Sequence, residues 1–448
     1  MASAIYRPTM NFVPVRPERS YAVKALERYW QNRESLILRL PIPEVLYPDI
    51  EQLPPPVEFV ELPNWATDIA VEGSLLVPKQ AIAEGETPPW TRTDWLWVIF
   101  WYLNGLAEQS FERQHGPIHS YSFQLKGWDS RLWSRAWVNR IALFLRRWAA
   151  REQGVSEQAL FGSLPKAEII LTHDVDAIAK TLAIRFKQTA FHSFNAVRSL
   201  LRGQIGSSLS KLANAAKFLF SQDNYWCFDR ITALEKTHGF RSHFNIYGGP
   251  GGWQRTFQEL LLDPAYSIAT HPKLKQQLQK MSAEGWTIGL HQSFNAWADA
   301  EQMQGERQRL EKALGFPVTS CRQHWLRFSW EQTWQAQQKA GFALDSTLGF
   351  NDRPGFRTGV ALQYHPWCFK SRREQNLQVL PMVLMDSHLY DYRNLSDSER
   401  NTQIAYWLDE IYAVHGTASV IWHQRVMSND YGWATGYETL LSTIEAKS

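Results

Sequence analysis

From Ala167 onward, short apolar runs of strand length alternate with longer runs of helix length. The strand-like runs are 168–172, 242–247, 286–290, 318–322, 342–345, 378–383 and 418–422, and helical patterns such as 300–314 and 330–340 lie between them. Such alternation favours parallel strands joined by crossover helices, in a barrel or an open sheet. We therefore expect an α/β fold whose strands point the same way.

The first part of the chain has a different pattern. Prolines punctuate 41–56 and 88–89, and helical patterns follow at about 95–111 and 135–150. The run Trp95–Leu103 is too short for a membrane span and predicts a buried helix capped by Thr93 or Asp94. We expect a mixed, largely helical amino-terminal accessory domain over 1–165, to which we assign no chemistry, and a (β/α) domain over 166–448.

Composition narrows the function classes. The chain has 448 residues, is 44% hydrophobic and carries a formal charge of only +3, which gives no reason to expect a nucleic-acid partner. Its three cysteines, Cys227, Cys321 and Cys368, form no CxxC pair, so neither a disulfide framework nor a cysteine zinc site is indicated. Because Met1–Tyr21 lacks an apolar core, we expect no cleaved signal peptide and a cytoplasmic protein.

A basic helical insertion is expected at about 177–222. This segment contains no Asp or Glu, whereas Lys and Arg recur among Leu, Phe and Ala. One interpretation is a peripheral contact with an anionic membrane surface, which would place the protein at the inner membrane face. The other, slightly favoured, is a solvated helical hairpin.

Acids and histidines stand at the ends of several expected strands. Thr172–Asp176 follows one apolar run, and His291, His324 and His423 follow or close three others. In a barrel the carboxyl ends of the strands converge on one face. Asp176 and His291 are our first two ligands for a divalent cation, which would activate water and polarise a carbonyl. Asp174 lies on the same side of the extended segment as Asp176 and is the expected base, with His423 as the acid.

These motifs, in this order, resemble those of the polysaccharide deacetylases of the NodB-homology, carbohydrate esterase type. The resemblance covers roughly 166–448. It is closest to a divergent bacterial branch that has an HDVD first motif and an extra amino-terminal domain, and it implies a distorted (β/α) barrel. The family's Asp-Asp pair corresponds to Asp174 and Asp176, with one residue inserted. Its His-x-x-x-His motif retains His291 but has Asn295 at the second position.

The remaining motifs of the family extend the comparison. Arg322 resembles the arginine that supports the base, Asp345 loosely resembles the acid of the fourth motif, and His423 fits the strand-end acid histidine. The resemblance thus implies Asp174, His423, Arg322 and Asp345 as catalytic residues. Because an amide oxygen is a poorer ligand than imidazole for zinc-like metals, the third ligand stays open. His324 ranks first, with His173 and Asn295 as alternatives, and His173 could instead orient Asp174. Asp345 and Arg322 could also simply form an ion pair, with Asp386 as a similar support.

The expected function is metal-dependent removal of N-acetyl groups from a polysaccharide or glycan precursor. Zinc is the first expectation for the ion, with cobalt, nickel or manganese as alternatives. A catalytically silent protein that binds glycans or scaffolds polysaccharide biosynthesis is the competing hypothesis. A hydrolase for a different amide or ester is the third, because fold and metal site do not fix the acyl group.

Overall fold

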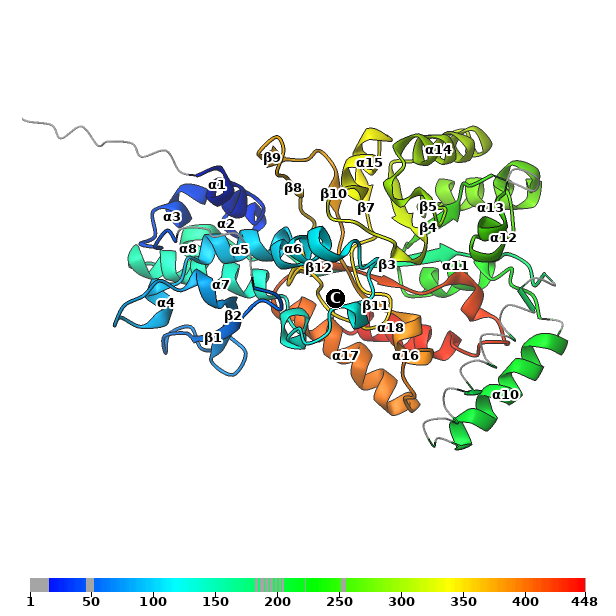
Figure 1. Cartoon of the computed structure of the whole chain (residues 1–448), viewed down its shortest axis with the longest axis horizontal. Coiled ribbons are helices and arrows are strands. Elements are labelled where there is room, and N and C mark those ends of the chain that lie inside the picture. The colour runs from blue at the N-terminus through cyan, green and yellow to red at the C-terminus, as the bar shows by residue number, and fades with distance from the viewer. Residues whose placement is uncertain are drawn as a thin grey trace, which may run out of the picture.

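The computed structural model describes residues 16–45, 52–181, 205–221, 223–250 and 255–447, with isolated residues between 184 and 203. Its central feature is an eight-stranded sheet in the order β10-β7-β6-β5-β4-β3-β12-β11 (Figure 1). Every neighbouring pair in this sheet is parallel. The strands are β3 (Glu168–Val175), β4 (His243–Tyr247), β5 (Thr287–Gln292), β6 (Ser320–Gln323), β7 (Leu344–Asp345), β10 (Gln378–Val379), β11 (Met382–Met385) and β12 (Thr417–Ile421).

The expected run 378–383 divides into two strands at opposite ends of this sheet. β10 pairs with β7, whereas β11 pairs with β12. Only Leu380 and Pro381 connect β10 to β11, and these two residues form hydrogen bonds with strands at opposite edges of the sheet. The Leu380 N–H donates to Asp345 O on β7, and Pro381 O accepts from Ser419 N on β12, each at 2.8 Å. Three residue steps span at most about 11 Å, so the sheet is curled until its edges nearly meet. The predicted α/β fold with a distorted barrel is confirmed.

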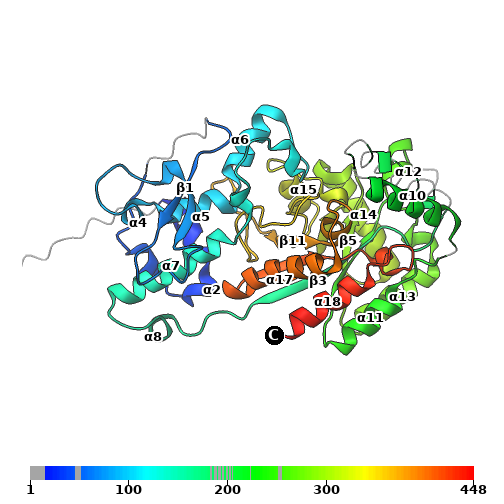
Figure 2. The same ribbon diagram turned by 90° about the horizontal axis from the view of Figure 1, so that it is seen from below.

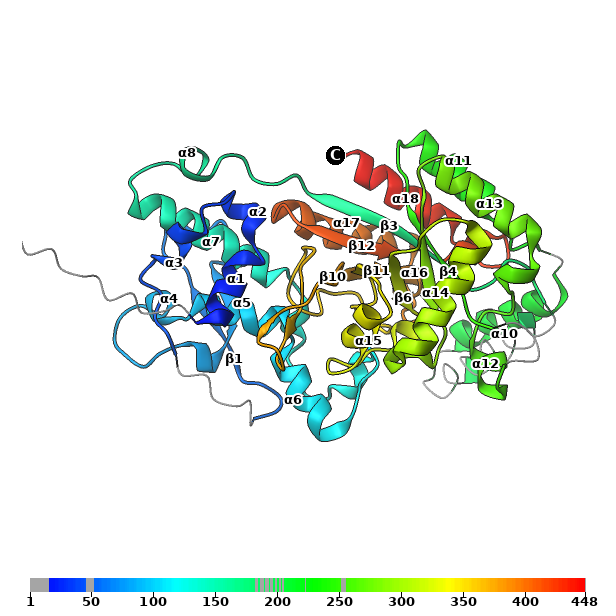
Figure 3. The same cartoon turned by 90° about the horizontal axis from the view of Figure 1, so that it is seen from above.

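Helices cover the outside of the curled sheet (Figure 3). They include α11 (Phe228–Thr237), α13 (Pro272–Ala283), α14 (Ala300–Leu314), α15 (Thr333–Lys339), α17 (Asp397–Ala413) and α18 (Ala434–Glu445). The bounds of α14 are those expected from its pattern. Asp299 caps it by accepting from the N–H groups of Glu301 and Gln302 at 3.0 Å, and Gly315 ends it at φ 84°. In the described part of the chain, no helix combines the length and apolar character needed to cross a membrane.

The amino-terminal region is a separate group of helices with one small antiparallel sheet (Figure 2). It contains α1 (Pro17–Lys24), α2 (Glu27–Trp30), α3 (Glu34–Leu38), β1 (Val57–Glu61), β2 (Ser74–Pro78), α4 (Pro89–Arg92), α5 (Trp95–Leu103), α6 (Leu106–His115), α7 (Trp137–Glu152) and α8 (Glu157–Phe161). Its mixed, mainly helical character is confirmed. Asp94 caps α5, accepting from the Trp97 N–H at 3.1 Å.

The expected helical pattern over 95–111 is interrupted at Gly105, which separates α5 from α6. Gly105 has φ 54°, a conformation that side-chain-bearing residues rarely adopt. A Cβ at this position would lie 2.3 Å from the ring of Trp330, a residue of the barrel. Apolar periodicity alone could not reveal the break, because it depends on this close approach between the two regions.

A buried ion pair joins the two regions. Arg357 donates to Glu108 on α6 at 2.7 Å, and the Trp330 indole donates to the same carboxylate at 3.0 Å. Glu108→Ala would leave the Arg357 charge buried without its partner. We expect the variant to lose about 3 kcal/mol of unfolding free energy in a denaturant titration. Glu284→Ala, which breaks an exposed pair with Lys236, is the control and should change stability little. Equal losses would contradict a specific role for the buried pair.

Candidate metal centre

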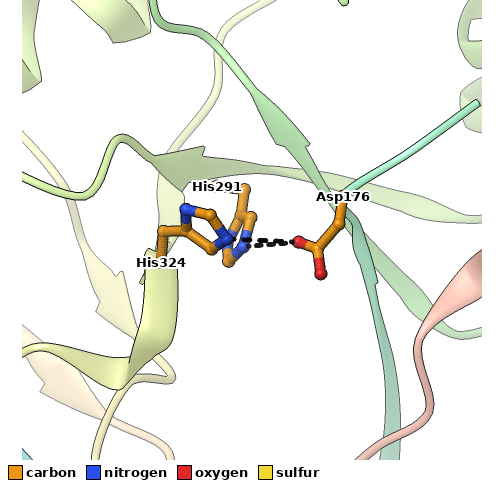
Figure 4. Close-up of side chains that lie close together, drawn as sticks. All are labelled: Asp176, His291 and His324. Carbon is orange, nitrogen blue, oxygen red and sulfur yellow. Dashed lines mark ion pairs between the residues drawn. The ribbon is translucent and has the colours of Figure 1, made fainter. Parts of the chain in front are cut away.

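Three potential ligands meet at the carboxyl ends of β3, β5 and β6 (Figure 4). His291 Nε2 lies 3.3 Å from Asp176 Oδ1, and His324 Nε2 lies 3.6 Å from the same oxygen. One ligand atom from each residue falls within 4.8 Å of those of the other two. The structure therefore brings together the two ligands expected first and the candidate ranked first for the third position.

Hydrogen bonds orient both imidazoles toward Asp176. His291 Nδ1 lies 3.1 Å from the carbonyl oxygen of Arg322, which can only accept a hydrogen bond. His324 Nδ1 lies 2.9 Å from Asp263 Oδ1, an oxygen that also accepts from the Phe294 N–H at 2.7 Å. When Nδ1 donates, Nε2 is left with a free lone pair. Such outer contacts are typical of metal-binding histidines because they fix the tautomer and the ring.

The carboxylate of Asp176 offers one oxygen to this group. Among the described residues, its buried Oδ1 has no hydrogen-bond partner, while Oδ2 pairs with Arg425. Burial alone would raise the pKa of Asp176, but Arg425 and the nearby histidines hold it well below its usual value. An ionised oxygen with no partner, facing two imidazole nitrogens, is a donor set that suits zinc and similar divalent ions. The residues present thus fit the expected ion.

Asp174 lies inside the curled sheet, beside this group. It accepts hydrogen bonds from Arg322 Nη1 at 3.0 Å and from Asn245 Nδ2 at 2.8 Å. Burial raises the pKa of Asp174, but Arg322, His291 and His423 together lower it to about 2. The carboxylate is therefore ionised near neutral pH.

The Arg322 guanidinium crosses the interior of the barrel. Arg322 stands on β6 and Asp174 on β3, three strands away, a separation of about 14 Å in a flat sheet. The contact forms because the sheet curls, and Arg322 Nη1 also donates to Thr172 Oγ1 at 2.7 Å. The Asn245 side chain that bonds to Asp174 lies beside Gly289. A Cβ on Gly289 would lie 2.7 Å from Asn245 Oδ1. The glycine keeps that space open.

His423 approaches the group from the end of β12. Asp386 holds it twice, accepting from its backbone N–H at 2.6 Å and contacting Nδ1 at 2.9 Å. Burial lowers the pKa of His423, but Asp386 and Asp176 raise it to about 9. Its Nε2 lies 3.7 Å from Asp176 Oδ2. The ring is therefore protonated near neutral pH, with a donor nitrogen directed into the site. Asp386 supports this histidine rather than a strand-end arginine.

Asp345 has neighbours other than those expected. It is fully buried and accepts from Trp334 Nε1 at 3.0 Å and Gln337 Nε2 at 2.9 Å, as well as from Thr347. Burial raises the pKa of Asp345. The alternative of an Asp345–Arg322 ion pair is wrong, because Arg322 pairs with Asp174 across the barrel.

Asn295 is engaged away from the three clustered residues. Its amide nitrogen lies 3.5 Å from Gln258 Oε1, and its amide oxygen accepts from Arg327 Nη1 at 3.3 Å. Within the described residues, no hydrogen bond links Asn295 to the cluster. Its expected role as a ligand stays a prediction, although the guanidinium beside its oxygen disfavours binding of a cation there.

His173 belongs to a separate buried network. Its Nδ1 lies 2.6 Å from the carbonyl oxygen of Trp422, and its Nε2 lies 2.8 Å from Glu235 Oε1. Successive strand residues point to opposite faces, so His173 faces away from Asp174 and Asp176. The alternatives that made His173 a ligand or a donor to Asp174 are wrong. Both ring nitrogens are occupied, one by the Trp422 carbonyl oxygen and the other by Glu235 on α11.

Three participants in the site were not predicted from the sequence: Asn245, which bonds to Asp174 from the adjacent strand β4, and the more distant Arg425 and Asp263. Arg425 reaches Asp176 from 249 residues away, and Asp263 reaches His324 across 61 residues. Neither stands in a recognisable motif. The one signal available was the position of Arg425, two residues after His423 in the segment that leaves β12.

A buried acid supports the loop that follows His291. Glu306 on α14 is fully buried and accepts from the Ser293 N–H at 3.0 Å and from the Ser293 hydroxyl. Burial raises the pKa of Glu306 from 4.5 to about 7. Folding therefore favours the protonated form. The stability that this preference contributes is complete below about pH 4.5 and is lost as the pH rises through about 7.

Glu306→Gln mimics the protonated acid at every pH. We expect the melting temperature of the variant to rise relative to that of the wild type as the pH increases from about 4.5 to about 7. Thermal melts of both proteins at several pH values provide the measurement. Glu301→Gln, at an exposed position of the same helix, should show no such trend. A difference between wild type and Glu306→Gln that does not change with pH would contradict the assignment.

Comparison with known proteins gives distant likenesses only. No family model and no curated protein matches the chain. Among solved structures, a protein from Mycobacterium smegmatis assigned as a polysaccharide deacetylase aligns at 15% identity, covering 63% of this chain and 86% of that one, with a TM-score of 0.37. The Bc1960 peptidoglycan N-acetylglucosamine deacetylase aligns at 12% identity over 63% and 81%, with a TM-score of 0.31. A protein from Pseudomonas aeruginosa PAO1, also assigned as a polysaccharide deacetylase, aligns at 12% identity over 64% and 90%, with a TM-score of 0.33.

Proposed function

We propose that the protein is a metal-dependent hydrolase that removes N-acetyl groups from a glycan or glycan precursor. The observation that carries the proposal is the group formed by Asp176, His291 and His324, with an ionised acid and a protonated histidine beside it. The order of the strand-end motifs along the chain supports the same activity.

A divalent ion held by Asp176, His291 and His324 would supply Lewis-acid polarisation of the amide carbonyl and would lower the pKa of water. Asp174 is placed to accept a proton from the attacking water, with Arg322 and Asn245 fixing its orientation. His423 is placed to donate a proton to the departing amine from Nε2, because Asp386 holds Nδ1. The site thus offers an anionic base, Asp174, and a cationic acid, His423, to the same amide group of the substrate.

A large cleft lies apart from the clustered residues, because its lining includes none of Asp174, Asp176, His291, His324 and His423. It has a volume of about 1240 Å³ and lies between the amino-terminal helices and the barrel, with Asn295 in its wall. Its lining mixes aromatic and amide side chains with charged ones, and several of its aromatic rings, including Trp97, Phe100 and Trp334, are buried. The glycan proposal therefore rests on the clustered residues and not on this cleft.

The test is acetate release from soluble N-acetylated oligosaccharides by the zinc-, cobalt-, nickel- or manganese-loaded protein. We expect acetate in a one-to-one ratio with new free amine, and its loss on chelation. Release of acetate from an O-acetylated oligosaccharide, with none from the N-acetylated one, would identify an ester as the substrate instead. The absence of both products from chitin, peptidoglycan and teichoic-type fragments would contradict the proposal.

The competing function is glycan binding without catalysis, and one contact favours it. Arg425 pairs with Asp176 Oδ2, so the carboxylate already has a cationic partner. A protein that binds glycan with unchanged affinity after chelation, and that releases no acetate, would support this alternative.

A further inference from the structure

A helix near the catalytic end of the barrel carries its apolar face outward. In α10 (Ile205–Phe220), the side chains of Ile205, Leu209, Leu212 and Phe220 are between 47% and 75% exposed. Ala213 and Ala216 are exposed as well. These positions recur at three- and four-residue intervals and therefore share one face of the helix. A surface helix of a globular protein normally turns such a face toward the core.

The opposite side of α10 is anchored. The buried Phe218 ring packs 4.9 Å from the ring of Tyr431, and Ser208 donates to the Ala196 carbonyl oxygen at 2.9 Å. Because these contacts attach one side of α10 to the protein, its apolar face points outward. Exposed apolar side chains also occur nearby in the chain at Val197 and Leu200, and at Leu260 and Leu261 on α12 (Phe257–Leu262).

Both exposed segments leave the edge of the sheet that carries the metal centre. The segment that contains α10 follows Asp176 at the carboxyl end of β3, and α12 follows the carboxyl end of β4. Figures 1 and 3 show both helices at the end of the molecule remote from the amino-terminal helices. Each segment begins at the strand ends where Asp176, His291 and His324 lie.

The charge of this segment identifies the kind of surface. Residues 177–222 contain seven Lys and Arg residues and no Asp or Glu. Two of the seven act inside the protein: Lys180 pairs with the buried Asp430, and Arg185 donates to the Ser221 carbonyl oxygen at 2.6 Å. The other five are Lys187, Arg198, Arg202, Lys211 and Lys217, whose side chains lie outside the described residues. By sequence, the segment therefore carries a net positive formal charge.

We propose that the apolar face of α10, together with Leu260 and Leu261, docks the protein onto the surface of an anionic lipid bilayer. Apolar side chains would enter the acyl boundary while lysines and arginines contact the headgroups, the combination that holds interfacial helices at membranes. Outward leucine and phenylalanine side chains, in a segment whose formal charges are all positive, favour a bilayer over a second copy of this chain, because a second copy would bring two like charges together.

The orientation that this docking imposes deepens the proposed function, on which this step rests. With α10 and α12 on the bilayer, the mouth of the barrel faces the headgroup region. The substrate class is then a glycan attached to a lipid and presented at the membrane surface, of which the soluble oligosaccharides in the assay represent the glycan part.

Flotation with phosphatidylcholine vesicles, with and without phosphatidylglycerol, tests the docking. We expect the wild type to float with the anionic vesicles and to be released by high salt. Leu209→Glu combined with Phe220→Glu should weaken partitioning about a hundredfold, because two large apolar side chains no longer enter the interface. Phe123→Glu combined with Val155→Glu changes two exposed apolar residues of the amino-terminal region and should float like the wild type.

Three results would overturn the proposal. The wild type could stay free of anionic vesicles at low salt, the α10 variant could float as well as the wild type, or the wild type could form a dimer that the α10 variant breaks. Thermal melts establish that both double variants are folded. Acetate release from a soluble oligosaccharide by the same preparations keeps the two hypotheses apart, because failure of the hydrolase assignment would leave flotation unaffected.

Discussion

His324→Ala should lower the affinity for zinc by more than the roughly ten- to hundredfold loss typical of a residue that only supports a ligand. His324 directs Nε2 at Asp176 Oδ1 from 3.6 Å, with its other nitrogen held by Asp263. Removal of the ring leaves one imidazole and one carboxylate, too few to hold an ion in a catalytic site. Titration with zinc, monitored by competition with a chromophoric chelator, measures the effect.

Two further variants separate a ligand from its support. Asp263→Asn keeps the His324 ring but removes the charge beside it, so an intermediate loss of affinity is expected. Asn295→Ala should change affinity little, because the Asn295 amide oxygen already accepts from Arg327. If Asn295→Ala instead lost as much affinity as His324→Ala, the third ligand would be Asn295 and the assignment of His324 would be wrong.

Asp174→Asn should reduce kcat for acetate release by about 10² to 10⁴-fold while the metal content stays near that of the wild type. The amide cannot accept the proton that we assign to the carboxylate, whereas Asp176, His291 and His324 are untouched. Arg322 loses its anionic partner in this variant, so a lower unfolding free energy is also expected. Single-turnover rates at saturating substrate, measured well below the melting temperature, separate the two effects.

Asp345→Asn provides the matched control for Asp174→Asn. Asp345 is also a buried acid, but it accepts hydrogen bonds from Trp334, Gln337 and Thr347 and does not contact the metal-binding residues. Its replacement should affect stability more than kcat. If Asp345→Asn abolished turnover of a folded, metal-loaded protein while Asp174→Asn did not, the base would have been placed on the wrong acid.

Much of the barrel could be predicted because its strands are buried and alternate with helices. Polar residues at the ends of such strands stand out, and parallel pairing brings those ends together. This is how Asp176, His291 and His324 could be grouped without a structure. Strand alternation places His173 on the face opposite to Asp174 and Asp176, yet its proximity to them in sequence kept it as an alternative ligand or donor, and both alternatives were wrong.

Other features depend on the path of the chain through space. Arg425, Asp263 and Gly105 act through partners far away in sequence, so no local pattern marks them. The division of 378–383 into strands at opposite edges follows from closure of the sheet, which two residues accomplish. Periodicity reports which residues are buried, but it does not report the edge of a sheet against which they pack.

The most direct test of the central claim is anomalous diffraction from crystals of the wild-type protein soaked with zinc, recorded on both sides of the zinc absorption edge. The account predicts one strong peak bonded to an Asp176 oxygen and to Nε2 of both His291 and His324, within reach of Asp174 and His423. A peak at Asn295, or no peak at this edge of the barrel after saturation with zinc, would contradict it.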